Sequence, residues 1–430
     1  MQRRRGRCSS ESRPTRLAAL RWPLSRYGER VDQLEPTLLV IPLLAVLAPL
    51  LARSLSQWVR VPIVVFELVL GIIAGPAVLG WAQPSDFADA LSEFGLAMLF
   101  FVAGSEIEFS AFRGRTGRRA VFGWLISLTA GVGLAWVLFP GEVAIVVGIA
   151  LCSTALGTIL PILRDAGELR TPFGKAMGAI GAVGEFGPLI AISLFLGGRD
   201  PGFETIVLAI FGVVSGLAIW LALRMPRGAM HRVVNGTLHT SGQFAIRVVF
   251  LILSALVALS ILLDLDMLLG AFAAGIVWRL LMRDADESDR TAVESKVEAV
   301  AFGFLVPVFF IYTGVTFDLS ALTTNPILLL AVPVVLIVLL LVRGLASMLA
   351  APPGSSRRDR IAVAFLGATA LPIIVAVTAI GVDEDILTSA HASVLIGAGM
   401  LSVLLFPLIA MTLRGERSAR VAAPLEDDLA

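Results

Sequence analysis

Long apolar stretches alternate with short polar, glycine-rich or proline-rich segments along almost the whole chain. A helix needs about 20 mostly apolar residues to cross the hydrocarbon core of a bilayer. Thirteen stretches approach or reach this length: residues 34–52, 61–81, 90–107, 120–139, 143–163, 176–196, 205–223, 244–263, 267–281, 297–315, 326–349, 361–380 and 392–413. The division between the eighth and the ninth is marked only by Asp264 and Asp266. The pattern predicts an all-α polytopic protein with about 13 transmembrane helices in a lipid bilayer.

The composition agrees with this pattern and excludes several classes of protein. Of the 430 residues, 57% are hydrophobic and 16% are charged, whereas ordinary soluble domains have about 25% charged residues. The formal net charge of +1 provides no basic field for nucleic acid. The two cysteines and three histidines form no metal-ligand pattern. We therefore expect no nucleic-acid partner, no cofactor, no resident metal and no enzymatic activity.

Positively charged residues are distributed unevenly between the two sets of loops. The loops after odd-numbered stretches, together with the C-terminal tail, hold 22 Lys or Arg residues, and the other loops hold one, Arg199. Cytoplasmic loops are enriched in Lys and Arg. The bias predicts a cytoplasmic C-terminus in a bacterial-type cytoplasmic (inner) membrane, and thirteen spans then place the N-terminus outside.

The N-terminal tail conflicts with this orientation, because the first 30 residues carry nine Arg. Three interpretations are open: a span is miscounted, the tail crosses because the later loops dominate, or the true start lies further along the chain. We favour the third, with Val31 as the start, because residues 31–35 then form a short lead-in. Residues 1–33 are accordingly interpreted as an Arg-rich tail outside the transmembrane domain.

The number and order of the spans suggest an inverted repeat, since one span between two sets of six turns the second set over. The expected transmembrane domain (34–413) then comprises a first repeat (34–196), a linker helix (205–223) and a second repeat (244–413). A short cytoplasmic tail, 414–430, follows.

The fifth span of each half carries the same three residues, Thr-Ala-Leu, beginning at Thr154 and Thr369. Gly157 and Pro161 follow the first copy, and Pro372 follows the second. Gly and Pro inside a span free main-chain groups that need new partners, and such broken helices surround binding sites in secondary transporters. We expect crossed discontinuous helices here; two ordinary helix kinks are the alternative.

Glu185 is the strongest candidate for a functional residue, because it lies near the centre of the sixth span. No other charged residue occurs between Lys175 and Arg199. An ionisable group at this depth is costly and indicates function. The flanking Gly184, Gly187 and Pro188 allow close backbone approach and free carbonyl groups that could turn toward a cation. A glutamic acid neutralised by a neighbour and merely tolerated is the alternative.

Arg343 is the second candidate. It lies in the eleventh span, where it could pair with Glu185 or snorkel to the cytoplasmic surface. The remaining ionisable residues in or near spans are more simply explained as helix-end, interface or loop residues; they are Glu67, Glu93, Glu106, Arg247, His231, His239 and His391.

Four passages of the chain resemble the monovalent cation:proton antiporters, in the branch that includes the Kef-type potassium/proton systems. They are VPIVVFELVLGIIAGPAVLG (61–80), LSEFGLAMLFFVAGSEIEF (91–109), LGAFAAGIV (269–277) and VPVFFIYTGVTFDL (306–319). The resemblance covers roughly residues 36–413. It implies about thirteen spans, two inverted repeats with crossed broken helices, and a homodimer in which a core domain moves against a scaffold.

The resemblance also implies roles for individual residues. Glu185 would bind the cation or proton, Ser153 and Thr154 would line the site, and Arg343 would be the charge partner. The family usually has Asn, Gln or Asp before its acid, whereas this chain has Gly184. With no second acid, an electroneutral cycle is expected. Only 17 residues follow Leu413, too few for the nucleotide-binding domain of Kef systems.

The expected function is secondary-active exchange of a monovalent cation, Na⁺ or K⁺, for a proton. Alternating access at a single buried carboxylate would carry it out. Two alternatives remain open: a gated cation channel, and an organic-anion transporter on a related inverted-repeat fold. A channel would need rings of carbonyls or charges that the chain does not display, and an anion site would need more basic groups at mid-membrane.

Overall fold

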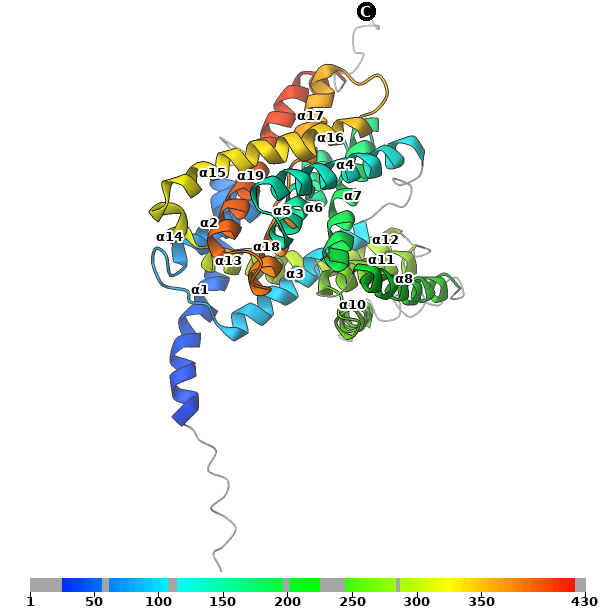
Figure 1. Ribbon diagram of the computed structural model, residues 1–430. Coiled ribbons are helices and arrows are strands. Elements are labelled where there is room, and N and C mark those ends of the chain that lie inside the picture. The colour runs from blue at the N-terminus through cyan, green and yellow to red at the C-terminus, as the bar shows by residue number, and fades with distance from the viewer. Residues whose placement is uncertain are drawn as a thin grey trace, which may run out of the picture.

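The computed structural model describes residues 25–55, 62–106, 114–195, 201–224, 244–283 and 287–421, and contains no strand in these ranges. The predicted all-α class is confirmed (Figure 1). The first half comprises α1 (Ser25–Leu55), α2 (Ile63–Ala74), α3 (Asp86–Glu106), α4 (Gly114–Leu138), α5 (Glu142–Leu151), α6 (Leu156–Asp165) and α7 (Pro172–Phe195), followed by α8 (Pro201–Arg224). The second half comprises α10 (Phe244–Leu262), α11 (Met267–Leu281), α12 (Glu287–Val300), η2 (Ala301–Leu305), α13 (Val306–Val315), α14 (Leu319–Thr324), α15 (Pro326–Leu339), η3 (Leu340–Gly344), α16 (Leu345–Ser347), η4 (Met348–Ala350), α17 (Arg357–Gly367), α18 (Pro372–Asp383) and α19 (Ser389–Val421).

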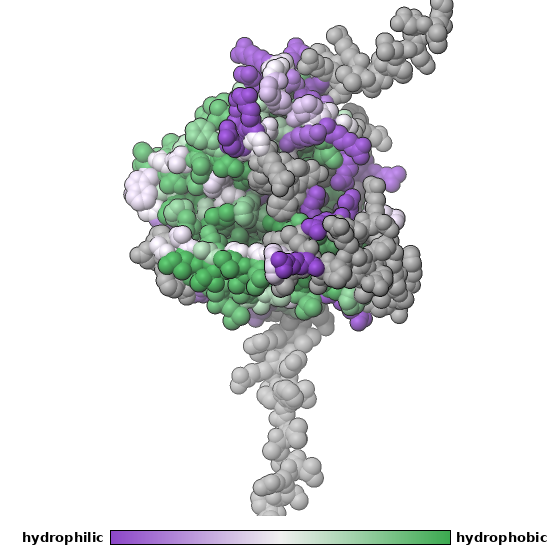
Figure 2. Space-filling view, turned by 90° about the vertical axis from the view of Figure 1, so that its right-hand side faces the viewer, coloured by the Kyte–Doolittle hydropathy of each residue, from purple (hydrophilic) through white to green (hydrophobic). Residues whose placement is uncertain are grey.

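The helices agree with the predicted membrane spans. Within the described ranges, ten helical segments are long and apolar enough to cross a membrane, and three shorter apolar helices are Ile63–Ala74, Thr205–Leu217 and Met267–Leu281. Each of the thirteen predicted spans coincides with one of them. Large apolar side chains such as Leu262 and Val137 are 82% and 80% exposed, as expected for surfaces that face lipid. Figure 2 shows broad hydrophobic areas next to a region of hydrophilic side chains. The protein is therefore a multi-pass membrane protein.

Several helix boundaries differ from the predictions. The second span was expected to continue to residue 81, but α2 ends at Ala74, because Gly75 precedes a proline and adopts an extended conformation. Helix α1 already begins at Ser25, inside the predicted tail, whereas residues 1–24 lie outside the described ranges. Helix α19 continues to Val421, beyond the predicted membrane end.

The weakly marked division between the eighth and ninth spans is confirmed. Asp266 caps α11, and its Oδ1 accepts a hydrogen bond from the Leu268 N–H at 2.8 Å. Asp264 has a φ of 61°, a left-handed conformation that turns the chain between α10 and α11. An aspartate cap and a left-handed aspartate thus separate two helices that apolar content alone would merge.

Glycines allow some helices to cross at very short distance. A Cβ on Gly104 of α3 would collide with the Phe272 carbonyl of α11, and one on Gly275 would collide with the Phe101 carbonyl. Helices α2 and α13 cross in the same way. Since lipid provides little hydrophobic drive for helix association, close packing through small residues is an important source of cohesion.

The interrupted helices lie in the interior of this arrangement. In Figure 1, α4 and α15 run across the upper part, and α5, α6 and α7 lie beneath them. Helices α8, α10, α11 and α12 lie at the lower right, where α11 packs against α3. The interruptions fall between α5 and α6 and between α17 and α18, the fifth span of each half.

Candidate functional site

Two unwound segments cross near the centre of the molecule. We call residues 152–155 the first break and residues 368–371 the second break; each separates two short helices. The Ala155 N–H donates to the Thr369 carbonyl at 2.7 Å, and the Thr154 hydroxyl donates to the Gly367 carbonyl at 2.6 Å. The predicted discontinuous helices are therefore present and bonded to each other, and the alternative of two ordinary kinks is wrong.

The glycine and prolines that predicted the two breaks lie at different positions relative to them. Pro372 is the first residue of α18, where its missing N–H and fixed φ suit a helix start. The first break ends before both Gly157 and Pro161, which lie inside α6. A Cβ on Gly157 would meet nothing within 4 Å. No close approach therefore requires glycine at that position.

The Glu185 carboxylate lies at the first break and has two unlike oxygens. Glu185 is only 4% exposed. Oε1 accepts hydrogen bonds from the main-chain N–H of Leu156 at 2.9 Å and of Gly157 at 3.4 Å. These donors belong to the first turn of α6, where N–H groups have no partner inside the helix and the dipole favours an anion. Oε2 has no hydrogen-bond partner among the described residues.

The glycines and proline around Glu185 explain how α7 meets the first break. Pro188 has no N–H to donate to the Gly184 carbonyl four residues earlier. That carbonyl instead accepts a hydrogen bond from the Thr154 N–H at 3.0 Å. The freed Gly184 carbonyl therefore bonds to the first break and does not turn toward a cation, in contrast to the prediction. Gly187 packs directly against the Trp124 ring of α4.

Ser153 and Thr154 are fully buried, and neither hydroxyl donates to Glu185. The Ser153 hydroxyl donates to the Ala150 carbonyl at 2.7 Å. The Thr154 oxygen accepts from the Arg343 Nε at 2.7 Å, while its proton goes to the second half of the chain. Both residues lie where the sequence placed them, and their role as ion ligands stays a prediction.

Arg343 is 1% exposed and does not snorkel to the surface. Its Nη2 donates to the Ile180 carbonyl at 2.9 Å and its Nε to Thr154. No ion pair joins Arg343 to Glu185 in the part of the chain that the structure describes. The expected charge pair is not formed among the described residues, and the guanidinium instead donates from Nε and Nη2 to the neutral oxygens of Thr154 and Ile180.

Comparison with known proteins shows the family of this chain. The family described as sodium/hydrogen exchanger, transmembrane, matches residues 43–413. The protein belongs to this exchanger family. Among curated relatives, the putative Na⁺/H⁺ antiporter YjbQ of Bacillus subtilis is 24% identical over 86% of this chain and 62% of that protein. The Na⁺/H⁺-K⁺ antiporter GerN of Bacillus cereus is 30% identical over 64% of this chain and 71% of that protein. The chain thus spans less than two thirds of the first relative's length.

The solved structures show that the fold is shared as well. The sodium proton antiporter MjNhaP1 from Methanocaldococcus jannaschii, determined at pH 8, superimposes with a TM-score of 0.62 at 17% identity. The match covers 90% of this chain and 99% of that one. The predicted sodium/proton antiporter fold, with its crossed broken helices, is therefore confirmed for this member of the exchanger family.

The other ionisable residues in or near the predicted spans lie, where the structure describes them, on helices that contain neither break. Glu67 is buried in α2 at 4% exposure, Glu106 is half-buried at the end of α3, and Glu93 and Arg247 are exposed. His391 lies on α19, with its Nδ1 2.9 Å from the Thr388 hydroxyl; His231 and His239 lie outside the described residues. The described ranges contain no group of three or more His, Cys, Asp or Glu side chains that could hold a metal ion.

Sequence reasoning missed a cluster that joins distant parts of this family's fold. Arg414 of α19 contacts the Glu168 and Asp359 carboxylates at 2.7 Å each, and its guanidinium lies 3.7 Å from the centre of the Phe173 ring. These three charged residues are far apart in the sequence, and no spacing or motif connects them. The main-chain donors of α6 were also missed, since no residue type marks an N–H group.

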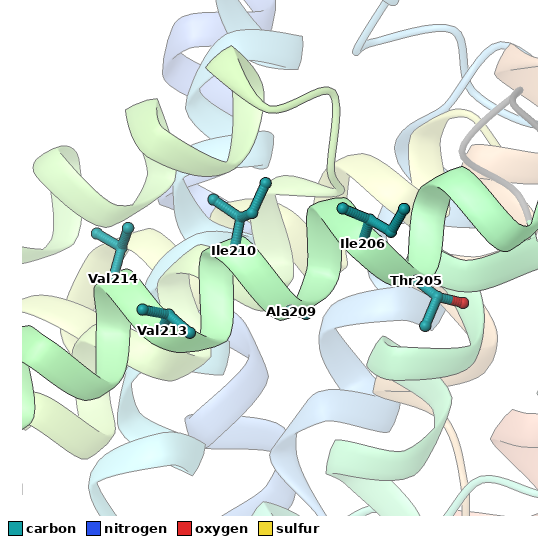
Figure 3. Close-up of a pocket in the computed structure, with 6 residues that line it drawn as sticks. All are labelled: Thr205, Ile206, Ala209, Ile210, Val213 and Val214. Atoms are coloured by element: carbon teal, nitrogen blue, oxygen red, sulfur yellow. The ribbon is translucent and has the colours of Figure 1, made fainter.

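One hollow on the surface does not belong to the site. It follows one side of α8 and is lined by Thr205, Ile206, Ala209, Ile210, Val213 and Val214 (Figure 3). Five of these six side chains are apolar, and none of the residues at the crossing lines the hollow. Such a surface suits contact with hydrocarbon, and Thr205 provides the one side-chain oxygen among its six lining residues.

Proposed function

We propose that the protein exchanges one monovalent cation, Na⁺ or K⁺, for one proton across the membrane by alternating access at the Glu185 carboxylate. One observation carries the proposal. Glu185 is 4% exposed, its Oε1 is anchored by two main-chain N–H groups, and its Oε2 has no partner among the described residues. A cation or a proton at Oε2 would complete the site.

Physical chemistry supports competition between the two ions. A bare carboxylate in an apolar interior is expensive, so Glu185 favours an occupant that neutralises it. Either a proton or a monovalent cation meets this need, and both require the same oxygen. The empty site would have to move an uncompensated charge across the barrier. Reorientation therefore occurs only when the site is occupied, and this links the two fluxes.

The surroundings of Arg343 also support exchange at Glu185. Because Arg343 donates to Thr154 and Ile180, no ion pair has to break before a cation or proton binds. Ser153 and Thr154 are proposed to assist as ligands through their oxygens. Each hydroxyl gives its proton to a carbonyl, and an oxygen lone pair remains on each.

The same proposal includes the setting of the protein. We place it in a cytoplasmic (inner) membrane as a homodimer, with the C-terminus inside and the N-terminus outside. The 22-to-1 distribution of Lys and Arg between the two sets of loops supports this orientation.

Reconstituted liposomes with an internal pH dye test the proposal. A gradient of Na⁺ or K⁺ should change the internal pH with wild-type protein. Glu185→Gln should abolish this exchange, because a neutral amide can neither take up a proton nor offer a negative charge to a cation. Glu185→Asp, which keeps the carboxylate, should retain part of the rate.

Glu67→Gln is the matched control, because Glu67 is equally buried at 4% exposure but lies on α2. It should exchange ions like wild type. Cation-dependent pH changes that persist in Glu185→Gln, in protein that remains monodisperse in detergent, would refute the role of Glu185.

A further inference from the structure

Arg343 keeps a positive charge fully buried without a carboxylate partner among the described residues. Burial of a cation is costly, and its hydrogen bonds must offset this cost. The bonds of Arg343 join three parts of the molecule: its own helix, the Thr154 hydroxyl of the first break, and the Ile180 carbonyl of α7. This geometry fits a residue that holds backbone elements in place better than one that neutralises an acid.

The helix around Arg343 has an irregular turn that changes the direction of its side chain. Residues Leu340–Gly344 form a π-helical turn, η3, between α15 and α16. A π turn contains one extra residue, and this rotates a side chain by about 100° relative to a regular α-helix. The Ser127 hydroxyl of α4 contacts the Val342 carbonyl at 3.2 Å, and the Ser347 hydroxyl donates to the Arg343 carbonyl at 2.8 Å. Hydroxyl groups on two helices therefore support the irregular turn.

Gly184 leaves the space that Arg343 and Thr154 fill. A Cβ at this position would lie 2.5 Å from the Thr154 Cβ and 2.6 Å from the Arg343 Nη2. Any side chain at 184 would therefore displace the contact between these two residues. The glycine before the acid and the buried arginine are two parts of one steric arrangement.

We propose that Arg343 is a positioning residue of the exchange site, which holds Thr154 so that the N–H groups of Leu156 and Gly157 stay aimed at Glu185. Thr154 lies only two residues before α6, and its hydroxyl links Arg343 to the Gly367 carbonyl. Loss of this link releases the start of α6 and weakens the anchor of Oε1. The inference rests on the proposed function for the meaning of the site, but its structural step can be measured separately.

A positioning role and a charge-pair role predict different results for Thr154. If Arg343 acts through Thr154, Thr154→Val and Arg343→Gln impair the same step, and the double variant is no worse than either one. If Arg343 acts by its charge on Glu185, the loss of that charge and the loss of the Thr154 oxygen are separate effects, and the double variant is worse than either single variant. A double-mutant cycle separates the two, because residues in one hydrogen-bond network are non-additive.

The experiment compares wild type, Arg343→Gln, Thr154→Val and the double variant in the liposome assay, with Na⁺ or K⁺ as the probe. Each single variant should raise the KM for the cation about tenfold, as expected for one lost hydrogen bond to a charged group. The double variant should show the same KM. Arg343→Lys should not restore the wild-type KM, since one ammonium cannot reproduce the planar fork with which the guanidinium donates to both Thr154 and Ile180.

Amide hydrogen exchange provides a readout that does not depend on transport. The peptide covering residues 152–157 should exchange faster in Arg343→Gln, Thr154→Val and the double variant. Thr154→Ser, which keeps the hydroxyl, should match wild type and shows whether the fold tolerates a change at 154. Arg279→Gln is the matched control: Arg279 also donates to a main-chain carbonyl, that of Ser105 at 2.8 Å, but on another helix pair. It should leave this peptide unchanged.

Three outcomes would overturn the positioning role: a KM in the double variant equal to the product of the two single effects, full rescue by Arg343→Lys, or unchanged amide exchange at 152–157. A wild-type protein without cation/proton exchange would refute the proposed function instead. The amide-exchange comparison would still decide whether Arg343 holds the break.

Discussion

At the scale of single residues, the two oxygens of Glu185 show what sequence can and cannot supply. An acid alone among apolar residues can be found by inspection, and the structure indeed places Glu185 at the crossing of the broken helices. Its partners could not be found that way, because they are main-chain N–H groups of Leu156 and Gly157. A sequence records side chains, and this anchor depends only on where a helix begins.

The glycines near Glu185 lead to a contrast that can be measured. Gly184→Ala should destabilise the protein, because its Cβ would lie 2.5 Å from the Thr154 Cβ in a buried segment; overpacking of this kind costs about 1–3 kcal/mol. Gly157→Ala should be neutral or stabilising by about 0.4–1 kcal/mol, since its Cβ meets nothing within 4 Å and the backbone is already helical.

Thermal unfolding of both variants in the same detergent checks this contrast. Gly178→Ala serves as the control on α7 itself, because a Cβ there also meets open space. Equal midpoints for Gly184→Ala and Gly157→Ala would contradict the packing around Thr154 and Arg343.

At the scale of elements, the positions of the helices were largely predictable and their irregularities were not. The repeated Thr-Ala-Leu at Thr154 and Thr369 located both breaks, since Gly and Pro nearby weaken a helix. The π turn that carries Arg343 has no such signal, because Leu340–Gly344 contains no residue type specific to that turn. The sequence suggested Glu185 as a partner of Arg343 or a position at the surface, and it gave no sign of the Thr154 hydroxyl and the Ile180 carbonyl.

A prediction at this scale concerns Arg414, which connects α19 with the loop before α7 and with the start of α17. Its side chain is 11% exposed, and those of Glu168 and Asp359 are 10% and 14% exposed. Arg414→Met should destabilise the protein by about 2–4 kcal/mol, because it leaves two nearby carboxylates without their shared cation. The thermal midpoint in detergent measures this loss.

Two further variants make the Arg414 prediction specific. Replacement of both carboxylates in the Arg414→Met background, by Glu168→Gln and Asp359→Asn, should recover part of the stability. Arg290→Met removes the exposed pair with Glu294, whose side chains are 45% and 50% exposed, and should cost less than about 1 kcal/mol. A similar loss in Arg414→Met and Arg290→Met would show that the buried cluster contributes no more than a surface pair.

At the scale of the whole molecule, the order of spans and the charge of the loops carry most of the information. Thirteen apolar stretches predicted an all-α polytopic fold, and the match to the sodium/proton antiporter fold agrees with it. Contacts between the halves, such as Thr154 with Gly367, depend on how two distant segments cross. The amino-acid composition does not indicate which segments cross.

The proposed exchange at the Glu185 carboxylate alone determines the stoichiometry expected of the whole carrier. Arg343 keeps its proton, because guanidinium groups do not deprotonate in proteins, and only Glu185 changes occupant in the proposed cycle. Bound H⁺ and bound Na⁺ or K⁺ carry the same charge, so both crossings move the same net charge and the complete cycle moves none.

The exchange rate at a fixed ion gradient should therefore not change when an ionophore for an untransported ion sets the voltage to different values. Internal pH, recorded at two or more imposed voltages with Glu185→Gln liposomes in parallel, tests this expectation. A rate that rises or falls steeply with voltage would require a second charge to move in each cycle, and exchange at Glu185 alone would then be insufficient.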